Sequence, residues 1–406
     1  MDKRRDYNIL DTIDKAVKSI TDDVIALRRD FHANPELGFQ EFRTAGIVEK
    51  YLQDLNIVTK RIAKTGVVGL IEGSKPGPVL MLRADMDALP VTEENDIPYK
   101  SKNPGVMHAC GHDGHTAALL GAAKILNDLR SELEGTIKLV FQPNEEIAGA
   151  CKMIEEGVLE NPKVDSVMGA HIWTPVPIGK IGISSGAVMA GLENFTITVN
   201  GFGGHTGYPE SAVDPIIAAT DIVQTAQRIQ TREISSNKPT IIMFGYISGG
   251  TQGNIIPDSV TLKGSIRILY DDCGEERPME RLKKLAEQVS AVHGCTCEVE
   301  SYTENIPLIN NPKLTELARN TAERVIKNQE DLIDFISMGS EDFSEFSKLV
   351  PGVFVAIGTG NKEKESHYPH HNPRFNIDED SLPMAVEMYV RYTLDYFELN
   401  KKERAK

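Results

Sequence analysis

The sequence predicts an α/β fold, in which a main domain is built on a mainly parallel sheet and a ferredoxin-like α+β satellite domain is inserted. Three observations predict it. The length of 406 residues exceeds that of one ordinary domain. Strand-like runs alternate with helix-like stretches in the outer parts of the chain, which is typical of parallel sheets. The middle part has the order βαββαβ. We expect the main domain at residues 1–182 and 303–406, and the satellite domain at residues 183–302.

The main domain is expected to begin with helices and to continue with buried strands. Residues 13–55 have a helical pattern that Pro35 interrupts. Residues 116–129 are rich in alanine and leucine and predict another helix. Apolar runs predict strands at residues 79–82, 137–141, 164–170 and 353–357.

The satellite domain has a different rhythm of elements. Alternating or apolar runs predict strands at residues 195–200, 240–247, 259–269 and 295–302, with helices at residues 213–229 and 276–293. In such a unit the helices cover one face of the sheet and leave the other face and an edge strand free. We expect a second subunit to pair there, which predicts a homodimer, with a tetramer as the alternative.

Polar side chains follow each predicted strand of the main domain. In chain order they are Asp85 and Asp87, Glu145 and Glu146, His171, and the pair His370 and His371. Sites in open α/β sheets lie beyond the carboxyl ends of the strands. We therefore expect these side chains to converge on one site.

The composition excludes several classes of protein. An apolar fraction of 40% and a charged fraction of 25% are those of a globular protein. A net charge of −15 argues against binding to nucleic acid or to an anionic membrane. No apolar run reaches the roughly 18 residues of a membrane span, and the charged N-terminus lacks a signal core. Five cysteines, an odd number without disulfide spacing, suit a reducing compartment, so we expect a cytoplasmic protein.

A dense group of metal-ligand types lies at residues 107–115, which read Met-His-Ala-Cys-Gly-His-Asp-Gly-His. Thiolate and imidazole are ligands of borderline divalent metals. Cys110 and His112 are the predicted ligands, although Cys110 could also be a small core residue. We expect His108 and His115 to support the ligands or to cap the following helix.

Two acidic pairs suit hydrolysis assisted by a metal. Glu145 and Glu146 are adjacent, and on an extended segment their side chains would point apart, so one could bind a metal while the other faces the reacting water. A solvated acidic pair is the alternative. Asp85 or Asp87 could orient a ligand histidine through its second N–H group. A plain strand-end cap is the alternative for them.

The satellite domain carries three further candidates. His205 lies in a glycine-rich loop and could donate a hydrogen bond to an oxyanion, or be a surface histidine. Asn254 belongs to the same domain. Arg267 suits a substrate carboxylate, or alternatively pairs with Asp271 or Asp272. The thiols of Cys295 and Cys297 share a strand face and are expected in the core.

Residues 340–343, Ser-Glu-Asp-Phe, are typical of a helix N-cap with acids in the first turn, and could alternatively border the site.

Taken together, these motifs resemble the M20 metallopeptidase and amidohydrolase family. More narrowly, they resemble its branch of N-acyl-amino-acid, hippurate, auxin-conjugate and N-acetyldiaminopimelate deacylases. The matching segments lie in family order at residues 83–90, 108–115, 141–146, 169–171, 203–205, 254–258, 339–343 and 371–373. Asn144 departs from the alanine that the branch often has before its glutamate pair, which leaves substrate preference open.

The resemblance implies hydrolysis of the amide bond of N-acyl amino acids, which releases a carboxylic acid and a free amino acid. It implies two divalent metal ions, Mn²⁺ or Zn²⁺ with Co²⁺ or Ni²⁺ as alternatives, bound by Cys110, His112, Glu146, His171 and His371. It implies that Glu145 is the general base and acid and that Asp87 supports the site. It also implies that His205, supplied across a dimer, stabilises the oxyanion, and that Asn254 and Arg267 hold the substrate carboxylate.

Other functions remain as alternatives. Within the family these are an N-acetyldiaminopimelate deacetylase or a dipeptidase. Outside it, Cys110 could be the nucleophile of a cysteine hydrolase. A non-catalytic metal-binding protein is the third alternative, although a closed structural site would not need Glu145 beside Glu146.

Overall fold

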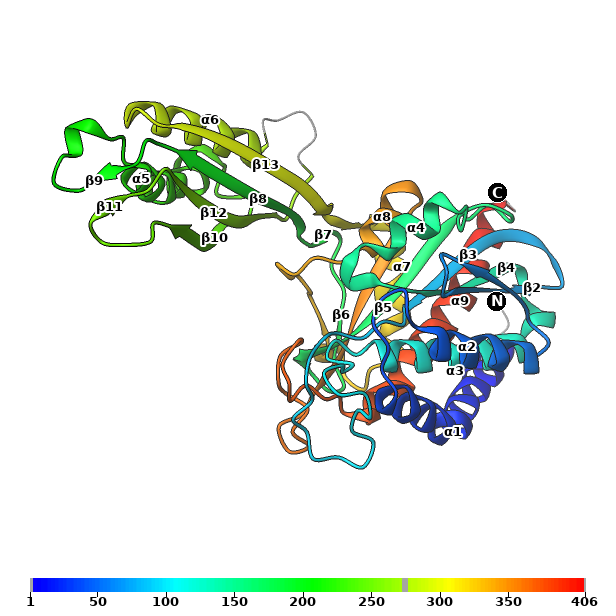
Figure 1. Ribbon diagram of the computed structural model, residues 1–406. Helices are drawn as coiled ribbons and strands as arrows, with labels where there is room; N and C mark the ends of the chain where they lie inside the picture. Colours follow the sequence, from blue (N-terminus) through cyan, green and yellow to red (C-terminus); the bar gives the residue numbers. More distant parts are fainter. Residues whose placement is uncertain (1–2, 272–276, 405–406) are drawn as a thin grey trace. The chain divides into compact units, whose positions relative to one another are not determined.

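The computed structural model describes residues 3–271 and 277–404, which belong to two compact units (Figure 1). The first unit comprises Met1–Gly186, Ile309–Ile336 and Asp342–Lys406, and the second comprises Ala187–Leu308 and Ser337–Glu341. Asp272, Cys273 and Glu276 lie outside the described residues, and so does the predicted pairing of Arg267 with Asp272. Among the described helices, none combines the length and the apolar character that crossing a bilayer requires.

An eight-stranded sheet runs through the first unit. Its four central neighbours, β4, β3, β5 and β16, are parallel, while β1 and β2 at one edge are antiparallel, so the prediction of a mainly parallel sheet is confirmed. The order across the sheet is β1 (Val58–Ile62), β2 (Gly66–Glu72), β4 (Glu134–Gln142), β3 (Lys75–Asp85), β5 (Ser166–Pro177), β16 (Gly352–Gly360), β6 (Ile181–Gly182) and β15 (Leu332–Ile333).

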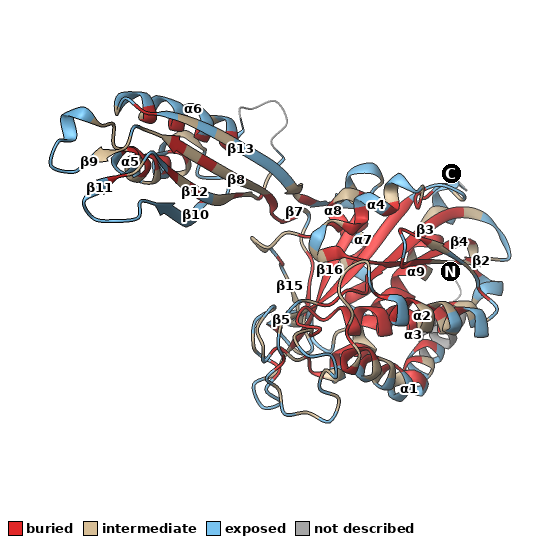
Figure 2. Ribbon diagram, viewed as in Figure 1, coloured by how far each residue is buried: buried red, intermediate tan, exposed pale blue. Residues whose placement is uncertain are grey.

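The central strands are buried along nearly their whole length (Figure 2). This is why they read as continuous apolar runs rather than as alternating ones. Three of the four predicted strands are confirmed. The fourth was expected to end before His171, which is wrong: β5 continues to Pro177 because β16 pairs with it past this point, with Gly358 opposite Trp173.

Helices cover both faces of the sheet. On one side α1 (Lys3–Ala33), α2 (Phe42–Asp54), α3 (His112–Asp128), α7 (Pro312–Ala322) and α9 (Leu382–Arg404) contact one another, and α4 (Gly149–Glu155) and α8 (Phe343–Leu349) form the other group. The long first helix is amphipathic, with a buried stripe at Ile13, Val17, Ile20 and Val24. The predicted break before Pro35 is confirmed, since α1 ends at Ala33.

The second unit has a four-stranded antiparallel sheet with two helices. Its elements are β8 (Gly191–Asn200), α5 (Pro215–Arg228), β10 (Thr240–Gly249), β12 (Ser259–Ile268), α6 (Pro278–Val292) and β13 (Thr296–Asn305), and the sheet order is β10-β12-β8-β13. A small ribbon pairs β9 (Gly204–His205) with β11 (Ile255–Ile256). The chain enters and leaves this unit near β7 (Gly186–Met189) and β14 (Leu308–Asn310).

The register of the main sheet aligns the predicted site residues at one edge. Asp85, the last residue of β3, lies opposite Gln142, the last residue of β4. Arg83 lies opposite Gly169 on β5, which brings His171 to the level of Asp85. The carboxyl ends of the central strands therefore meet where the sequence predicts a site.

Candidate metal centre

Cys110 and His112 occupy the sharp entry into helix α3. Gly111, between them, has φ +97°, a left-handed conformation that glycine adopts readily. Because the helix begins immediately afterwards, His112 is fully buried in its first turn. The turn brings a thiol and an imidazole together at the end of β3.

The structure brings the five predicted ligands into two groups that share Cys110. One group is Cys110, His112 and His171, and the other is Cys110, Glu146 and His371; the donor atoms within each group lie within 4.8 Å of one another. Cys110 Sγ lies 3.6 Å from His171 Nε2, and Glu146 Oε1 lies 3.3 Å from His371 Nε2. Two adjacent three-donor groups are an arrangement that can hold two cations.

The buried histidines of the first group present the same nitrogen to this centre. His112 Nδ1 lies 2.9 Å from the carbonyl oxygen of Asp87 and donates to it, and His171 Nδ1 donates to the carbonyl of Ile172 over 2.8 Å. Each ring therefore keeps the lone pair of Nε2 for a ligand bond.

The donor atoms fit divalent metal ions better than they fit one another. Among the described residues, His112 Nε2 and Glu146 Oε1 are buried atoms without a hydrogen-bond partner. Burial, and then the charge of Glu146, raises the pKa of the Cys110 thiol. A cation would satisfy the unpartnered atoms and stabilise the thiolate, and the mixture of sulfur, nitrogen and oxygen suits borderline metals.

Asp87 organises the acidic pair. Its Oδ1 accepts a hydrogen bond from the backbone N–H of Glu145 over 3.0 Å, and its Oδ2 accepts one from the N–H of Glu146 over 3.2 Å. The pair lies in a short 3-10 turn, Glu145–Ile147, so the predicted extended geometry is wrong. The reason is Asn144, whose left-handed backbone ends the strand direction. Glu145 Oε2 lies 3.8 Å from His112 Nε2, close to the first group of donors.

His115 lies beside the donor groups and is held by two hydrogen bonds. Its Nδ1 donates to Asp85 Oδ1 over 2.6 Å, and its Nε2 accepts from the backbone N–H of Ile172 over 2.8 Å. Its ring centroid lies 4.4 Å from that of His171 and 5.5 Å from that of His112. Both aspartates after β3 therefore orient histidines, and the supporting role expected for His115 agrees with these contacts.

Arg83 was not expected beside the site, whereas Asp342 belongs to the segment for which bordering the site was the alternative to a helix cap. Asp342 Oδ1 accepts from Arg83 Nη2 over 3.0 Å, and both of its carboxylate oxygens accept from Gln142. Arg83 Nη1 in turn donates to Asp85 Oδ2 over 2.6 Å. Helix α8 does begin at this segment, with Asp342 at the N-cap position rather than in the first turn. The Asp342 side chain makes no capping hydrogen bond, because its carboxylate accepts from Arg83 and Gln142 instead. The Ser-Glu-Asp-Phe motif was the available signal.

Three further histidines, His108, His370 and His371, differ in whether they reach the donor groups. Both ring nitrogens of His108 are buried without a partner among the described residues, and His108 belongs to neither donor group. His370 Nε2 lies 3.2 Å from the carbonyl oxygen of Ile172, whereas His371, at φ +65°, reaches Glu146. The neighbouring side chains of Cys110 and Glu146 raise the pKa of His371 to about 10. The structure thus places His371, not His370, among the donors.

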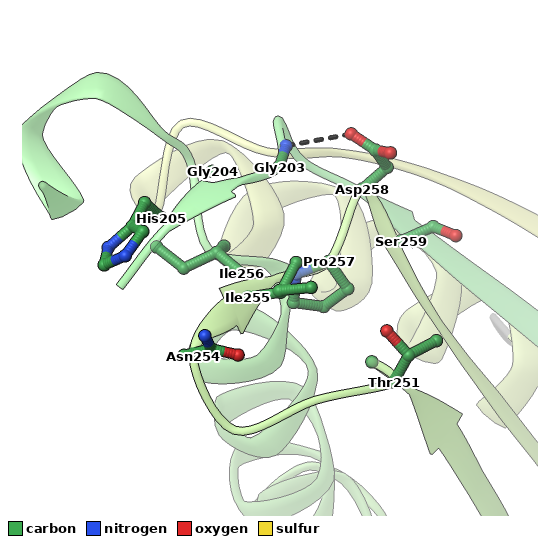
Figure 3. Close-up of a pocket in the computed structure, with 11 residues that line it drawn as sticks. Gly203, Gly204, His205, Thr251, Asn254, Ile255, Ile256, Pro257, Asp258 and Ser259 are labelled. Atoms are coloured by element: carbon green, nitrogen blue, oxygen red, sulfur yellow. Dashed lines mark hydrogen bonds between the residues drawn. The ribbon is translucent and has the colours of Figure 1, made fainter. Parts of the chain in front are cut away.

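In the second unit, His205 and Asn254 line an open hollow of about 640 Å³ (Figure 3). His205 is exposed, and its Nδ1 accepts a hydrogen bond from Gly207 N over 2.9 Å, so in the neutral ring Nε2 carries the proton and can donate. Arg267 is not among the lining residues; its Nη1 donates to the carbonyl of Met338 over 2.8 Å. Cys295 lies in the core of this unit as expected, and Cys297 is partly buried against it.

The chain is similar to a known peptidase family and to several characterised proteins. Residues 81–395 match the model of the peptidase family M20/M25/M40. The chain is 36% identical over 381 residues to the N-acetylcysteine deacetylase of Bacillus subtilis (strain 168), a match that covers 93% of this chain and 98% of the relative. It is 38% identical over 386 residues to thermostable carboxypeptidase 2 of Saccharolobus solfataricus, covering 93% and 96%. It is 37% identical over 394 residues to the IAA-amino acid hydrolase ILR1-like 2 of Arabidopsis thaliana, covering 95% and 87%.

A solved structure supports the same relationship. The YXEP protein of Bacillus subtilis, described as a dinuclear metal-binding peptidase from the M20 family, superposes with a TM-score of 0.82 at 32% sequence identity. The match covers 94% of this chain and 99% of the YXEP protein. The mixed α/β fold with its mainly parallel sheet is therefore shared with a protein that binds two metal ions.

Proposed function

This chain belongs to the peptidase family M20/M25/M40, and on that premise we propose that it hydrolyses the amide bond of N-acyl amino acids. Water is consumed, and the products are a carboxylic acid and a free amino acid. Relatives named as a deacetylase, an amino acid conjugate hydrolase and a carboxypeptidase all cleave a bond of this kind. The observation that carries the proposal is the pair of donor groups sharing Cys110, with Glu145 held beside them.

Two divalent cations would be held by the two donor groups. Cys110, His112 and His171 are the proposed ligands of one, and Cys110, Glu146 and His371 those of the other. Bound there, the cations would supply Lewis acidity to the amide carbonyl and lower the pKa of the attacking water. Sulfur in the ligand set favours Zn²⁺, Mn²⁺, Co²⁺ or Ni²⁺ over Mg²⁺.

Glu145 is the proposed proton carrier. Asp87 holds its backbone, and its carboxylate lies beside His112 without belonging to the two groups that share Cys110. In the reaction it takes a proton from water as the C–O bond forms, and then gives that proton to the nitrogen as the C–N bond breaks. Adjacent Glu146 would be a charged ligand of the cation, so the two glutamates would have different roles.

The second unit is the proposed satellite domain, ferredoxin-like and inserted at residues 183–302, for substrate binding and dimerisation. Its edge strand β10 exposes three large apolar side chains, Met243, Tyr246 and Ile247, which a second copy of the chain would cover. We propose that His205, donating through Nε2 from the second subunit, stabilises the oxyanion. Asn254 and Arg267 would hold the substrate carboxylate.

A reducing, cytoplasmic setting is also proposed. Cys110, Cys151, Cys295 and Cys297 are all free thiols, and these are the cysteines that the structure describes. A free Cys110 is a requirement of the proposed ligand set.

The direct test is a hydrolysis screen of N-acetyl, N-benzoyl and indole-acetyl amino acids, with Mn²⁺, Zn²⁺, Co²⁺ and Ni²⁺ added in turn. We expect release of free amino acid that depends on the added metal. N-acetyldiaminopimelate and simple dipeptides belong in the same panel, because they represent the two alternatives within the family. If the protein hydrolyses one of these two and none of the N-acyl amino acids, the proposed substrate is wrong, whereas the proposed amide hydrolysis stands.

Two further measurements separate the other classes. A cysteine hydrolase would keep its activity in chelator and lose it to a thiol alkylator. The proposed enzyme loses activity in chelator, recovers it when metal is restored, and resists the alkylator while metal is bound. A non-catalytic metal-binding protein would bind metal and show no turnover on the panel.

A further inference from the structure

Glu41 is a completely buried carboxylate that joins two distant segments to the edge of the metal centre. Its exposed fraction is 0%. Its Oε2 accepts a hydrogen bond from Thr65 Oγ1 over 2.6 Å, and its Oε1 accepts one from the backbone N–H of Asn144 over 2.9 Å. Thr65 lies in the turn between β1 and β2, and Asn144 immediately precedes the acidic pair. A buried carboxyl group with few partners is costly, so its position calls for a reason.

The segment that Glu41 contacts has an uncommon backbone conformation. Asn144 has φ +54° and ψ +44°, in the left-handed region, which asparagine adopts more readily than most residues other than glycine. Its side-chain amide donates to the carbonyl of Ile147 over 2.8 Å, and its own carbonyl accepts from Gly149 N over 2.8 Å. Such conformations persist where surrounding contacts determine them.

Gly38 completes the contact from the N-terminal segment. A Cβ atom on Gly38 would lie 1.8 Å from Asn144 Oδ1, so the asparagine side chain rests directly on the glycine backbone. Gly38 and Glu41 thus hold Asn144 by its side chain and by its backbone N–H. Both lie in the segment between α1 and α2, more than one hundred residues earlier in the sequence.

Two carboxylates together bind three successive backbone N–H groups. Glu41 accepts from Asn144, while Asp87 accepts from Glu145 and from Glu146. Successive N–H groups beside a left-handed residue form a concave anion-binding surface. Here two buried side chains from different parts of the chain fill it.

We propose that Glu41 is a positioning residue that, with Thr65 and Gly38, sets the turn from which Glu145 and Glu146 project. The role rests on the proposed function, in which Glu145 carries the proton and Glu146 binds metal. A shift of about 1 Å in a catalytic group can cost about 100-fold in rate, so loss of this contact is expected to act through kcat rather than through substrate binding.

Glu41→Ala and Glu41→Gln test the proposal, with Glu36→Ala as the matched control. Glutamine keeps an acceptor for Asn144 N and a partner for the Thr65 hydroxyl. Glu36 is a glutamate of the same segment, whose carboxylate accepts from Arg43 N over 3.0 Å and Thr44 N over 2.8 Å at the start of α2. Thr65→Val, which removes one hydrogen bond at similar volume, is the milder variant if Glu41→Ala does not fold.

Three readouts are measured on the full chain: amide hydrogen exchange of residues 144–148 without metal, Zn²⁺ affinity by chelator competition, and kcat and KM. For Glu41→Ala we expect faster exchange, and affinity and kcat lowered by about 10- to 100-fold with KM little changed. Thr65→Val should move in the same direction by less, and Glu41→Gln and Glu36→Ala should stay near wild type.

Unchanged exchange and affinity in Glu41→Ala, or an equal change in Glu36→Ala, would overturn the proposal. The exchange and affinity measurements need no substrate. If the wild-type protein hydrolyses no amide, the proposed function fails, while these two readouts still decide whether Glu41 positions the turn.

Discussion

Asp87→Asn is the substitution for which the structure predicts the most specific effect. Asp87 is 2% exposed, and its carboxylate faces three N–H groups: those of Glu145 and Glu146, and Nδ1 of His112 at 3.2 Å. All three are donors, and an amide offers only one acceptor oxygen. If that oxygen accepts from Glu145 and His112, the new NH₂ group faces the backbone N–H of Glu146. Two donors then oppose each other, and the hydrogen bond to Glu146 is lost.

The magnitude follows from this single lost contact. A hydrogen bond to a charged acceptor contributes about 1.5–3 kcal/mol, and the opposed donors remain buried. A loss of about 2–3 kcal/mol at Glu146 corresponds to roughly 30- to 160-fold in an equilibrium constant, at about 1.36 kcal/mol per factor of ten. We therefore expect metal affinity to fall by roughly 30- to 160-fold, close to the usual effect of about 10- to 100-fold for losing a residue that orients a metal ligand.

Chelator competition with Zn²⁺ and Mn²⁺ measures the effect, and the kcat of the metal-saturated protein shows whether Glu145 has moved as well. Asp96→Asn is the control, because Asp96 is exposed and lies in the same segment between β3 and α3. It removes the same charge without touching the site. An Asp87→Asn protein that binds metal within about threefold of the Asp96→Asn protein would refute the reasoning.

Three other predictions concern separate parts of the molecule. Glu145→Gln should lower kcat by about 10²- to 10⁴-fold while bound metal, measured by atomic emission, stays at the wild-type level; near-normal kcat would contradict the role of Glu145. Cys110→Ser should weaken the binding of Zn²⁺ more than that of Mn²⁺ in equilibrium dialysis, because a hard hydroxyl oxygen replaces a soft thiolate ligand. Equal losses of affinity for the two metals would contradict this prediction. Burial raises the pKa of the Glu41 carboxyl from an ordinary 4.5 to about 7. Between these pH values the folded protein keeps a proton that the unfolded chain loses. The free energy of unfolding of the wild type, relative to that of Glu41→Gln, should therefore fall as the pH rises from about 4.5 to about 7. Urea denaturation measures this difference, and a difference that does not change with pH would contradict the prediction.

Local sequence was sufficient to predict the main strands and the residues that converge at their ends. The apolar runs of β3, β4 and β16 are long and are bounded by polar chemistry, so their type and position could be read directly. The prediction made for Cys110, His112 and His171 is equally local, since thiolate and imidazole are ligand types of borderline divalent metals.

Contacts between distant segments could not be predicted in this way. Asp342 reads as a helix cap from its neighbours, but Arg83 and Gln142 occupy its carboxylate. Glu41 reads as one more charge near a helix start, but Thr65 and Asn144 bury it. In both cases the partner lies far away in the sequence, so nothing near the residue indicates its role.

The sequence by itself determined the types of side chain available for chemistry and the strands that end beside them, because hydrophobic period and ligand type are properties of short segments. The tertiary structure alone decided that Cys110 is shared by two donor groups and that the acidic pair lies in a turn whose backbone N–H groups donate to Asp87 and Glu41. The physical reason is that ligand geometry depends on distances of a few ångströms between segments that only the packed sheet and its helices bring together.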